Sequence, residues 1–370
     1  MIGDPVPRLL TSTVLSINLD AVCANYNFLL SHLNGIPLAA VVKANGYGLG
    51  AVKIGQALTA AGCTVFFVAH LNEGVTLRSA LPNAEIHILN GLLPNALKIY
   101  REYALVPVLC SLGDLEIWKN FNTPSPLPCD IHVDTGMLRL GLPPAELSIL
   151  QKDRDRLLGL NIRFIMSHLA SSEDMNSKQN PMQLEAFKQA RKILPMGKAC
   201  FANSSGIFLS PLYHFNMARS GIAIYGANPT PGKPNPMTPT ITLRAQIIQV
   251  RDAEPGDTIG YNATHRVKDK TRIATVPVGY ADGFIRSLSN KAVGIIDDFS
   301  VPLVGRVSMD LITFDVTNVP EEKCHPGQWI ELIGAKNPID SVAQSGGTIA
   351  YEILTSLGDR YHRTYIGGPG

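Results

Sequence analysis

Several polar side chains that could act in catalysis or ligand binding stand at the ends of short apolar runs in this sequence. They are Lys43, Asp134, His168, Asn203, Ser204 and Arg219. Short runs rich in valine, isoleucine, alanine and phenylalanine are typical of strands buried in a parallel sheet. The strands of a parallel barrel end on one face, where barrel enzymes form their active sites. One such residue is most often a solvated loop residue, but the group together predicts a site on that face.

Lys43 follows the run AAVV and precedes the segment ANGYGLGA. A lysine at the mouth of an apolar barrel loses water, which lowers its pKa and prepares the neutral amine to form a Schiff base with a carbonyl group. The segment GYGLGA also fits the G-x-G-x-x-A pattern of a dinucleotide-binding turn. That pattern needs an acidic residue near the end of the next strand, but the run VFFVA leads into His70 and the first carboxylate is Glu73. The sequence therefore favours a Schiff-base lysine over a dinucleotide site.

A phosphate-binding region is predicted after the last two apolar runs of this series. Asn203 and Ser204 follow one run, and the backbone amides of Gly221 and Ile222 follow Arg219. Barrels commonly bind phosphate at the ends of their last two strands. A Schiff-base lysine with a phosphate site indicates a phosphorylated carbonyl cofactor, for which pyridoxal 5'-phosphate is the leading candidate. The 9 histidines show no H-x-x-x-H spacing and no cluster with cysteine, so no metal site is predicted.

The elements that must position these residues are strand candidates separated by segments of helical periodicity. The strand candidates are residues 38–42, 65–69, 85–89, 106–109, 130–133, 163–166, 199–202 and about 217–225. Segments 144–158 and 181–194 carry apolar residues at three- and four-residue steps, as helices that cover a sheet do. A doubly wound sheet usually stops at about five or six strands. The repeated units therefore predict an α/β fold with a (β/α)8, TIM-type barrel.

The pattern changes after Asn228, where the breaker-rich segment PTPGKPNPMTP precedes alternating runs such as ITLRAQIIQV, RIATVPV and WIELIG. Alternation is typical of short antiparallel strands, and helical periodicity nearly disappears here. We predict a barrel domain at residues 1–238 and a C-terminal, mainly antiparallel β domain at residues 239–370. Segment 12–22 is typical of a strand leading into a helix, and one hypothesis pairs the first ~15 residues with the β domain.

Composition limits the class of protein and its surroundings. The chain has 370 residues, of which 45% are hydrophobic and 17% charged, so it is predicted to be globular. Its formal net charge of +2 gives no broad basic field, so nucleic acid is not expected as a partner. The start MIGDPVPRLL shows no secretory signal, no run of about 18 apolar residues could form a membrane helix, and the 6 scattered cysteines are expected to be reduced. These features predict a cytoplasmic protein without a membrane segment.

Eight motifs make the chain resemble the fold-type III, pyridoxal-phosphate-dependent alanine racemases over nearly its whole length. In order they are AVVKANGYGLG, VDTGMLRLG, MSHLASSED, ANSSG, RSGIAIYG, VGYADG, GRVSMD and YEIL. The resemblance implies a cofactor-binding barrel with a C-terminal β domain and interconversion of L-alanine and D-alanine, which in a bacterium supplies precursors of cell-wall peptidoglycan. It also implies a head-to-tail homodimer in which each active site is completed by the partner's β domain.

The resemblance also gives roles to residues at matching positions. It implies that Lys43 holds the cofactor and exchanges a proton with one face of the substrate, while Tyr280 serves the other face. Two such groups are needed because a proton leaves one face of a planar carbanion and another returns to the opposite face. The other implied cofactor-binding residues are Tyr47, His168, Ser204, Arg219, Gly221, Ile222 and Tyr351. The implied substrate-binding residues are Arg139 and Met309.

Two of these roles have a physical reason. A tyrosine has an ordinary pKa of about 10, so Tyr280 needs a cation such as Arg139 and a hydrogen bond from His168 to favour its ionised form. Arg219 is implied to face the pyridine nitrogen. A carboxylate there would keep the nitrogen protonated, whereas an arginine cannot, and this favours quick return of the proton to the α-carbon.

The sequence departs from the family at two positions. Many members carry a carbamylated lysine two residues before the aspartate of VDTGM, where this chain has His132. Imidazole is not anionic under ordinary conditions, so Arg139 needs another partner. The alternatives are a bound anion such as chloride, which we favour, and a water-mediated chain from His132. Leu49 stands where a histidine is common, and nothing in the sequence explains this change.

Two other functions are compatible with the sequence. A racemase for serine, or one of broader specificity, would use the same site residues. The size of the substrate side chain would be decided by loops whose positions the sequence does not show. A non-catalytic pyridoxal-phosphate homeostasis protein resembles the barrel but lacks the β domain. The presence of Tyr280 and Met309 within residues 239–370 favours an enzyme.

Overall fold

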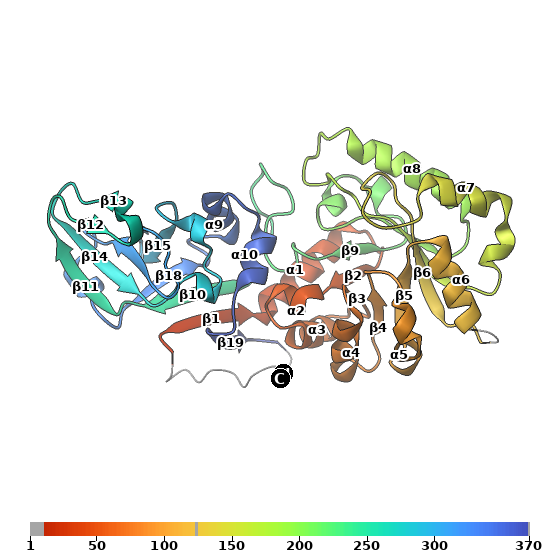
Figure 1. The fold of residues 1–370 in the computed structure, drawn as a ribbon, viewed down its shortest axis with the longest axis horizontal. Helices are drawn as coiled ribbons and strands as arrows, with labels where there is room; N and C mark the ends of the chain where they lie inside the picture. Colours follow the sequence, from red (N-terminus) through yellow and green to blue (C-terminus); the bar gives the residue numbers. More distant parts are fainter. Residues whose placement is uncertain (1–10, 123–124, 369–370) are drawn as a thin grey trace. The chain divides into compact units, whose positions relative to one another are not determined.

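The computed structural model describes residues 11–122 and 125–368. The start of the chain, on which the predicted absence of a secretory signal rests, lies outside the described residues. The described chain divides into two compact units, one of residues 22–237 and the other of residues 11–21 with 238–368 (Figure 1).

A ring of parallel strands forms the centre of the unit of residues 22–237. In the described part of this unit the strands are β2 (Leu38–Val41), β3 (Val65–Val68), β4 (Glu85–Ile88), β5 (Leu105–Leu109), β6 (Pro128–His132), β7 (Asn161–Met166), β8 (Lys198–Cys200) and β9 (Ala218–Ser220). They pair in the order β8-β7-β6-β5-β4-β3-β2-β9. A parallel bridge between Cys200 and Met217, with a 2.8 Å hydrogen bond from the Arg219 N–H to the Ala202 carbonyl, joins the two ends of this order. The predicted (β/α)8 architecture is confirmed.

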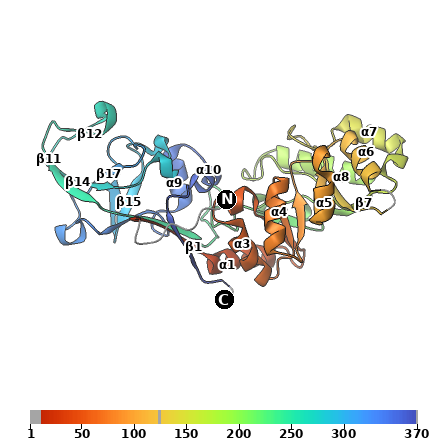
Figure 2. The same cartoon turned by 60° about the horizontal axis from the view of Figure 1, so that its bottom comes forward.

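Every residue of β2, β3 and β5 is buried, as expected for strands covered on one face by the barrel interior and on the other by helices (Figure 2). The helices are α1 (Leu19–His32), α2 (Lys43–Tyr47), α3 (Ala51–Ala60), α4 (Leu71–Ala80), α5 (Leu97–Glu102), α6 (Leu112–Phe121), α7 (Pro144–Lys152) and α8 (Gln179–Ile193). The helix expected over residues 144–158 is shorter in the structure. Asp153 leaves the helical conformation with φ −125° and ψ 82°, so α7 ends at Lys152 and a 3-10 turn, η3 (Arg154–Leu157), follows.

The other unit is built mainly from antiparallel strands. They are β1 (Thr13–Asn18), β10 (Ile241–Gln246), β11 (Gln249–Ala253), β12 (Thr258–Ile259), β13 (His265–Arg266), β14 (Thr271–Val276), β15 (Val293–Ile296), β16 (Phe299–Pro302), β17 (Ile312–Asp315), β18 (Trp329–Ile333) and β19 (His362–Ile366). The largest sheet has the order β16-β15-β18-β10-β1-β19. The N-terminal strand β1 pairs antiparallel with β10 and parallel with β19.

The run ITLRAQIIQV forms two strands instead of one. The Ile247 N–H donates to the Gln328 carbonyl at 2.8 Å, and the next N–H, that of Ile248, donates to the Thr275 carbonyl at 2.9 Å. The chain therefore passes from the sheet of β10 to the sheet of β11 between these two residues, which a hydrophobic pattern alone does not indicate.

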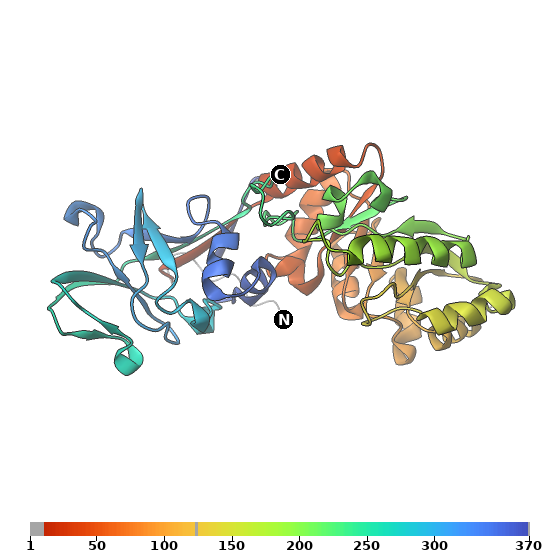
Figure 3. The ribbon, with the colours of Figure 1, turned by 90° about the horizontal axis from the view of Figure 1, so that it is seen from above.

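Two short helices, α9 (Ile339–Gly346) and α10 (Ala350–Ser356), lie in the region where nearly no helix is expected from sequence; Figure 3 shows them in blue among the strands of their unit. α9 buries Ile339, Val342 and Ala343, a helical spacing that the prediction overlooked. Within residues 11–122 and 125–368, no helix combines the length and apolar character needed to cross a membrane. Across the same ranges, no group of three or more potential metal ligands gathers.

Candidate active site

Lys43 stands at the carboxyl end of β2, where the chain turns through left-handed conformations. Ala44, Asn45 and Tyr47 have φ values of 52°, 53° and 54°, which residues with a Cβ adopt rarely and at an energetic cost. Burial lowers the pKa of the Lys43 amine, the positive charge of Arg139 acts in the same direction, and a nearby glutamate opposes both. Lys43 therefore loses its proton more readily than an exposed lysine, as a nucleophilic amine must.

The glutamate is Glu73 of α4, and it holds the turn that follows Lys43. Its Oε1 accepts a hydrogen bond from the Ala44 N–H at 2.6 Å. Its Oε2 accepts hydrogen bonds from the N–H groups of Ala69 and His70 at 2.8 and 2.9 Å. The Glu73 carboxylate thus joins the loop after β2 to the loop after β3. These hydrogen bonds hold the strained turn that follows Lys43 in place.

Groups that can bind phosphate meet at the ends of β8 and β9. The Ser204 hydroxyl accepts a hydrogen bond from the Gly221 N–H at 3.0 Å and lies 2.9 Å from the Ser220 hydroxyl. A Cβ on Gly221 would lie 2.2 Å from the Tyr47 hydroxyl oxygen, so any larger residue here would displace the Tyr47 side chain. In the described structure, no acceptor takes a hydrogen bond from the Ile222 N–H. Hydroxyl and N–H groups with no carboxylate among them suit a phosphate dianion.

Arg219, at the centre of β9, is buried and held by neutral acceptors. Its Nη2 donates to the Ser167 carbonyl at 2.6 Å. Its Nη1 donates to the Cys200 carbonyl at 3.0 Å and lies 2.9 Å from the Cys200 sulfur. No carboxylate of the described chain forms an ion pair with this guanidinium. Its charge is therefore available to a bound ligand.

Two histidines of the barrel are held neutral. Burial lowers the pKa of His168 well below its usual value, and the charges of Arg219 and Arg139 lower it further. Burial and the same two arginines lower the pKa of His132 to about 3, although the Asp134 carboxylate opposes them. Arg139 itself is exposed, and among the described residues it has no hydrogen-bond acceptor.

Tyr280 and Met309 are brought together in the other unit. The Tyr280 N–H donates to the Ser308 carbonyl at 3.0 Å, and the Ala281 N–H donates to the Met309 carbonyl at 3.1 Å. A Cβ at Gly279 would lie 2.2 Å from the Met309 carbonyl oxygen, so the two loops could not approach this closely with another residue there. Tyr280 is 43% exposed and Met309 is 54% exposed.

The predicted site residues thus divide between the two units. Tyr280, Met309 and the half-buried Tyr351 of α10 belong to residues 238–368. The residues in the barrel unit are Lys43, Tyr47, Arg139, His168, Ser204, Arg219, Gly221 and Ile222.

Three residues that support the site were not singled out from the sequence. They are Glu73, Cys200 and Tyr225, whose ring stacks on that of Tyr47 with centroids 4.4 Å apart. Only Glu73 carries a local signal, because it stands three residues after His70 at the start of α4, the capping-box position. The contacts of Cys200 and Tyr225 join segments that are distant in sequence, which no local pattern reveals.

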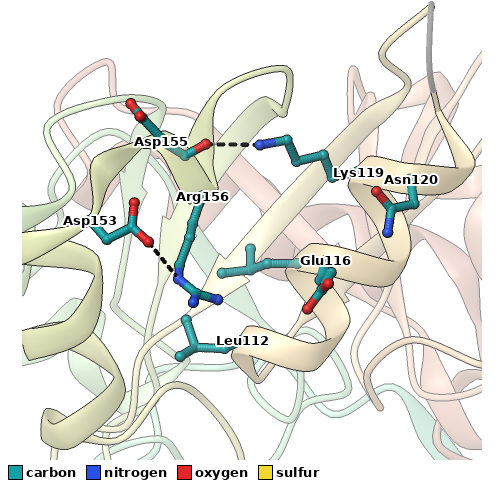
Figure 4. A pocket seen from close by; sticks show the side chains of 8 residues that line it. Leu112, Glu116, Lys119, Asn120, Asp153, Asp155 and Arg156 are labelled. Atoms are coloured by element: carbon teal, nitrogen blue, oxygen red, sulfur yellow. Dashed lines mark hydrogen bonds and ion pairs between the residues drawn. The ribbon is translucent and has the colours of Figure 1, made fainter.

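A pocket of about 330 Å³ lies elsewhere on the barrel unit, between α6 and η3 (Figure 4). Lys119 donates to the Asp155 carbonyl at 2.8 Å, and Arg156 donates to the Asp153 carboxylate at 3.0 Å (Figure 4). No predicted site residue lines this pocket, and both of its cations have partners, so it is not a candidate for the active site.

The fold and the barrel residues define a class of protein. They form a (β/α)8 barrel with a lysine of lowered pKa, a phosphate-binding group and a guanidinium without an ion-pair partner among the described residues. The same chain also contains a second unit rich in antiparallel strands. This donor set fits pyridoxal phosphate, which offers an aldehyde to an amine, a phosphate to hydroxyl and N–H donors, and a ring nitrogen to a hydrogen-bonding side chain.

Comparison with known proteins extends over both units. The family of the alanine racemase N-terminal domain matches residues 17–229, and that of the alanine racemase C-terminal domain matches residues 240–365. A catabolic alanine racemase of Mesorhizobium japonicum is 43% identical over 369 residues, covering 99% of this chain and 96% of the relative. An alanine racemase of Rickettsia bellii is 46% identical over 339 residues, covering 90% of this chain and 83% of the relative.

A solved structure gives the same result. The crystal structure of alanine racemase from Bartonella henselae with covalently bound pyridoxal phosphate has a TM-score of 0.93 and 40% sequence identity, covering 96% of this chain and 100% of that one. The chain therefore belongs to the alanine racemase family.

Proposed function

We propose that this protein interconverts L-alanine and D-alanine with pyridoxal 5'-phosphate bound to Lys43. The observation that carries the proposal is one barrel that holds an amine of lowered pKa at the end of β2 and the Ser204–Gly221 phosphate site at the ends of β8 and β9. β2 and β9 are parallel neighbours, so their carboxyl ends lie on one face. Relatives named alanine racemase cover nearly the full chain, which supports alanine as the substrate.

The proposed mechanism gives two residues of this chain the proton transfers. Pyridoxal phosphate, when bound, withdraws electrons from an amino acid and makes its α-proton acidic. Lys43, whose lowered pKa favours the neutral amine, accepts a proton from one face or returns one to it. Tyr280 does the same at the other face. The α-carbon inverts only when one residue takes the proton and the other returns one, so both are required.

The other residues bind and orient. Arg219 would face the ring nitrogen. A guanidinium does not titrate near neutral pH and would keep its own protons, so the α-carbon would remain the favoured site for the returning proton. Arg139 and Met309 would bind the substrate, and His168 would support the cofactor. The groups proposed to bind the phosphate are Tyr47, Ser204, Gly221, Ile222 and Tyr351.

The active protein is proposed to be a homodimer, with each site completed by the β unit of a second copy. The division of site residues between two compact units supports this proposal, as does the exposure of Tyr280 and Met309 in the single chain. A cytoplasmic location is proposed because no disulfide bond joins the cysteines of the described residues.

Two measurements test the proposal. Purified protein mixed with pyridoxal phosphate should show the absorbance of the lysine-bound cofactor, which Lys43→Ala should abolish, because no other residue of the site carries an amine. A panel of amino acids should then be racemised with alanine preferred. Equal or faster turnover of serine would favour the broader racemase, and cofactor binding without turnover of any amino acid would favour a homeostasis role. The presence of a second unit that carries Tyr280 favours an enzyme that turns over amino acids, because a homeostasis protein lacks the β domain.

A further inference from the structure

A buried charge cluster joins β4, β6 and β7 inside the barrel unit. Nδ1 of His87 lies 2.6 Å from Oδ2 of Asp130, and Nε2 lies 3.2 Å from Oε1 of Glu85. Arg163 donates two hydrogen bonds to the Glu85 carboxylate, at 2.9 and 2.7 Å. The His87 and Asp130 side chains are completely buried. Neither residue belongs to the proposed active site.

The cluster is electrically balanced only while His87 is protonated. It then contains two cations and two carboxylates, and Arg163 is the partner of Glu85 rather than of Asp130. The second oxygen of Asp130 accepts the Phe164 N–H at 3.1 Å. No other cation of the described chain forms an ion pair with Asp130, so His87 is the direct partner of its charge. Loss of the imidazolium charge would leave a buried carboxylate uncompensated, which is costly in a low dielectric.

Phe67 connects this cluster to Arg219. The Phe67 ring stacks on His87 with centroids 4.5 Å apart and an interplanar angle of 21°. The Arg219 guanidinium carbon lies 5.7 Å from the centre of the same ring, within the range of a cation–π contact. The contact between Phe67 and His87 follows from sheet register, because the two residues are direct partners on neighbouring strands.

Asp130 is close enough to influence the surroundings of Arg219. Burial raises the pKa of the Cys200 thiol, and the negative charge of Asp130 raises it further, while Arg219 opposes both. Cys200 is also a hydrogen-bond partner of Arg219. An uncompensated Asp130 would therefore attract a guanidinium that otherwise has only neutral partners.

We propose that His87 and Phe67 are positioning residues for Arg219. His87 neutralises Asp130, so the carboxylate does not draw the guanidinium away from the Ser167 and Cys200 carbonyls. Phe67 contacts both the His87 ring and the Arg219 guanidinium, and it keeps the guanidinium in place. The inference rests on the proposed role of Arg219 at the ring nitrogen of the cofactor, and it adds residues that touch neither cofactor nor substrate.

The test is a charge cycle in the full-length protein. His87→Gln keeps a hydrogen-bond donor near Asp130 but removes the positive charge. His87→Gln with Asp130→Asn removes both charges. We expect the single variant to lower kcat about tenfold with a smaller change in KM, and the double variant to recover kcat to within about threefold of the parent. A purely structural role predicts the reverse order, because the double variant loses more native interactions.

A matched control lies at the outer end of the same cluster. Arg163→Gln removes an ion pair to Glu85 that is partly exposed to solvent, without touching Asp130, and should change kcat by less than about twofold. Phe67→Leu keeps an apolar side chain but removes the ring, and should lower kcat as His87→Gln does.

Crystal structures of the cofactor-free variants give a readout independent of activity. We expect Arg219 to turn toward Asp130 in His87→Gln and to rest on the Ser167 and Cys200 carbonyls in the double variant. An unmoved Arg219 and an unchanged kcat in His87→Gln would overturn the inference. If the parent protein does not racemise alanine at all, the proposed function fails, and the position of Arg219 in the two crystal structures still decides the inference.

Discussion

At the scale of single residues, the candidate site concentrates positive charge and keeps its imidazoles neutral. Lys43, Arg139 and Arg219 lie in one barrel with His132 and His168, whose pKa values are lowered first by burial and then by the two arginines. Such a site suits two anions, a phosphate and a carboxylate. Neutral imidazoles with so low a pKa are poor proton donors at neutral pH. This supports the proposal that Lys43 and Tyr280, rather than these histidines, carry the proton transfers.

Replacement of Tyr280 tests this division of labour. Tyr280→Phe should keep the cofactor absorbance and lose most racemisation, by roughly 10²- to 10⁴-fold, because one of two proton routes disappears. Exchange of the α-proton with solvent on the Lys43 face should continue, measured by NMR in deuterated water. Tyr261→Phe is the matched control, because Tyr261 is an exposed tyrosine of the same unit. Unchanged racemisation in both directions would show that Tyr280 is not the second acid–base group.

The environment of Arg139 gives a second prediction at this scale. A histidine with a pKa of about 3 is neutral at pH 7, so His132 cannot supply the negative charge of a carbamate. We expect a bound chloride to pair with Arg139. Exchange of chloride for a bulky anion at constant ionic strength should lower kcat/KM several-fold, while removal of carbon dioxide should change nothing. If the bulky anion has no effect and His132→Ala lowers turnover, a water-mediated chain is the better account.

At the residue scale, the sequence identifies candidate site residues at the ends of predicted strands but not those inside the strands. Lys43, Ser204 and Arg219 are visible because they follow or interrupt apolar runs. Cys200 and Asp130 lie inside such runs, where a thiol or a single carboxylate looks like part of a buried strand. Their contacts to Arg219 and His87 exist only once the barrel has closed, so the sequence could not indicate them.

At the scale of elements, the barrel was predictable because apolar residues recur at different spacings in its strands and in its helices. The runs at residues 65–69 and 85–89 correspond to β3 and β4, and the pattern at 181–194 corresponds to α8. Two of the differences concern where an element ends, which a periodic pattern does not mark. Asp153 ends α7 within a continuous helical pattern, and Ile248 begins a new sheet within a continuous strand pattern.

The ion pair between His87 of β4 and Asp130 of β6 predicts how stability depends on pH. Burial opposes protonation of His87, but the carboxylates of Asp130 and Glu85 outweigh it and raise its pKa from 6.5 to about 9. A folded-state pKa above the unfolded value stabilises the protein fully below pH 6.5, and this contribution is lost as pH rises to about 9.

Chemical denaturation at one fixed protein concentration measures this effect. Between pH 6.5 and about 9, the unfolding free energy of the parent should fall by about 3 kcal/mol more than that of His87→Gln, which has no imidazole at this position to titrate. Other groups titrate equally in both proteins and cancel in the difference. Parallel pH profiles for the two proteins would contradict a protonated His87 in the folded state.

At the scale of the whole molecule, the chain separates the two proposed acid–base groups into two compact units. Lys43 belongs to residues 22–237 and Tyr280 to residues 238–368. The proposed homodimer explains this division, since a second copy can supply the β unit to each barrel. The obligate pairing of two copies would make activity depend on assembly.

Subunit exchange tests the shared site. Lys43→Ala and Tyr280→Phe proteins should each be inactive, and mixing them should restore activity. In a heterodimer one site combines both substitutions and the other has neither, so about half of its sites should be active if partners contribute independently. Exchange is checked by mass spectrometry of differently tagged chains. Verified heterodimers without activity would mean that each site is closed within one chain.

The most direct test of the central claim follows the two enantiomers of alanine from both directions. Purified protein with pyridoxal phosphate should convert pure L-alanine and pure D-alanine to the same equal mixture, since enantiomers have equal free energy in water, and Lys43→Ala should convert neither. Chiral chromatography of the two reactions measures this outcome. Bound cofactor with no interconversion in either direction would contradict the account.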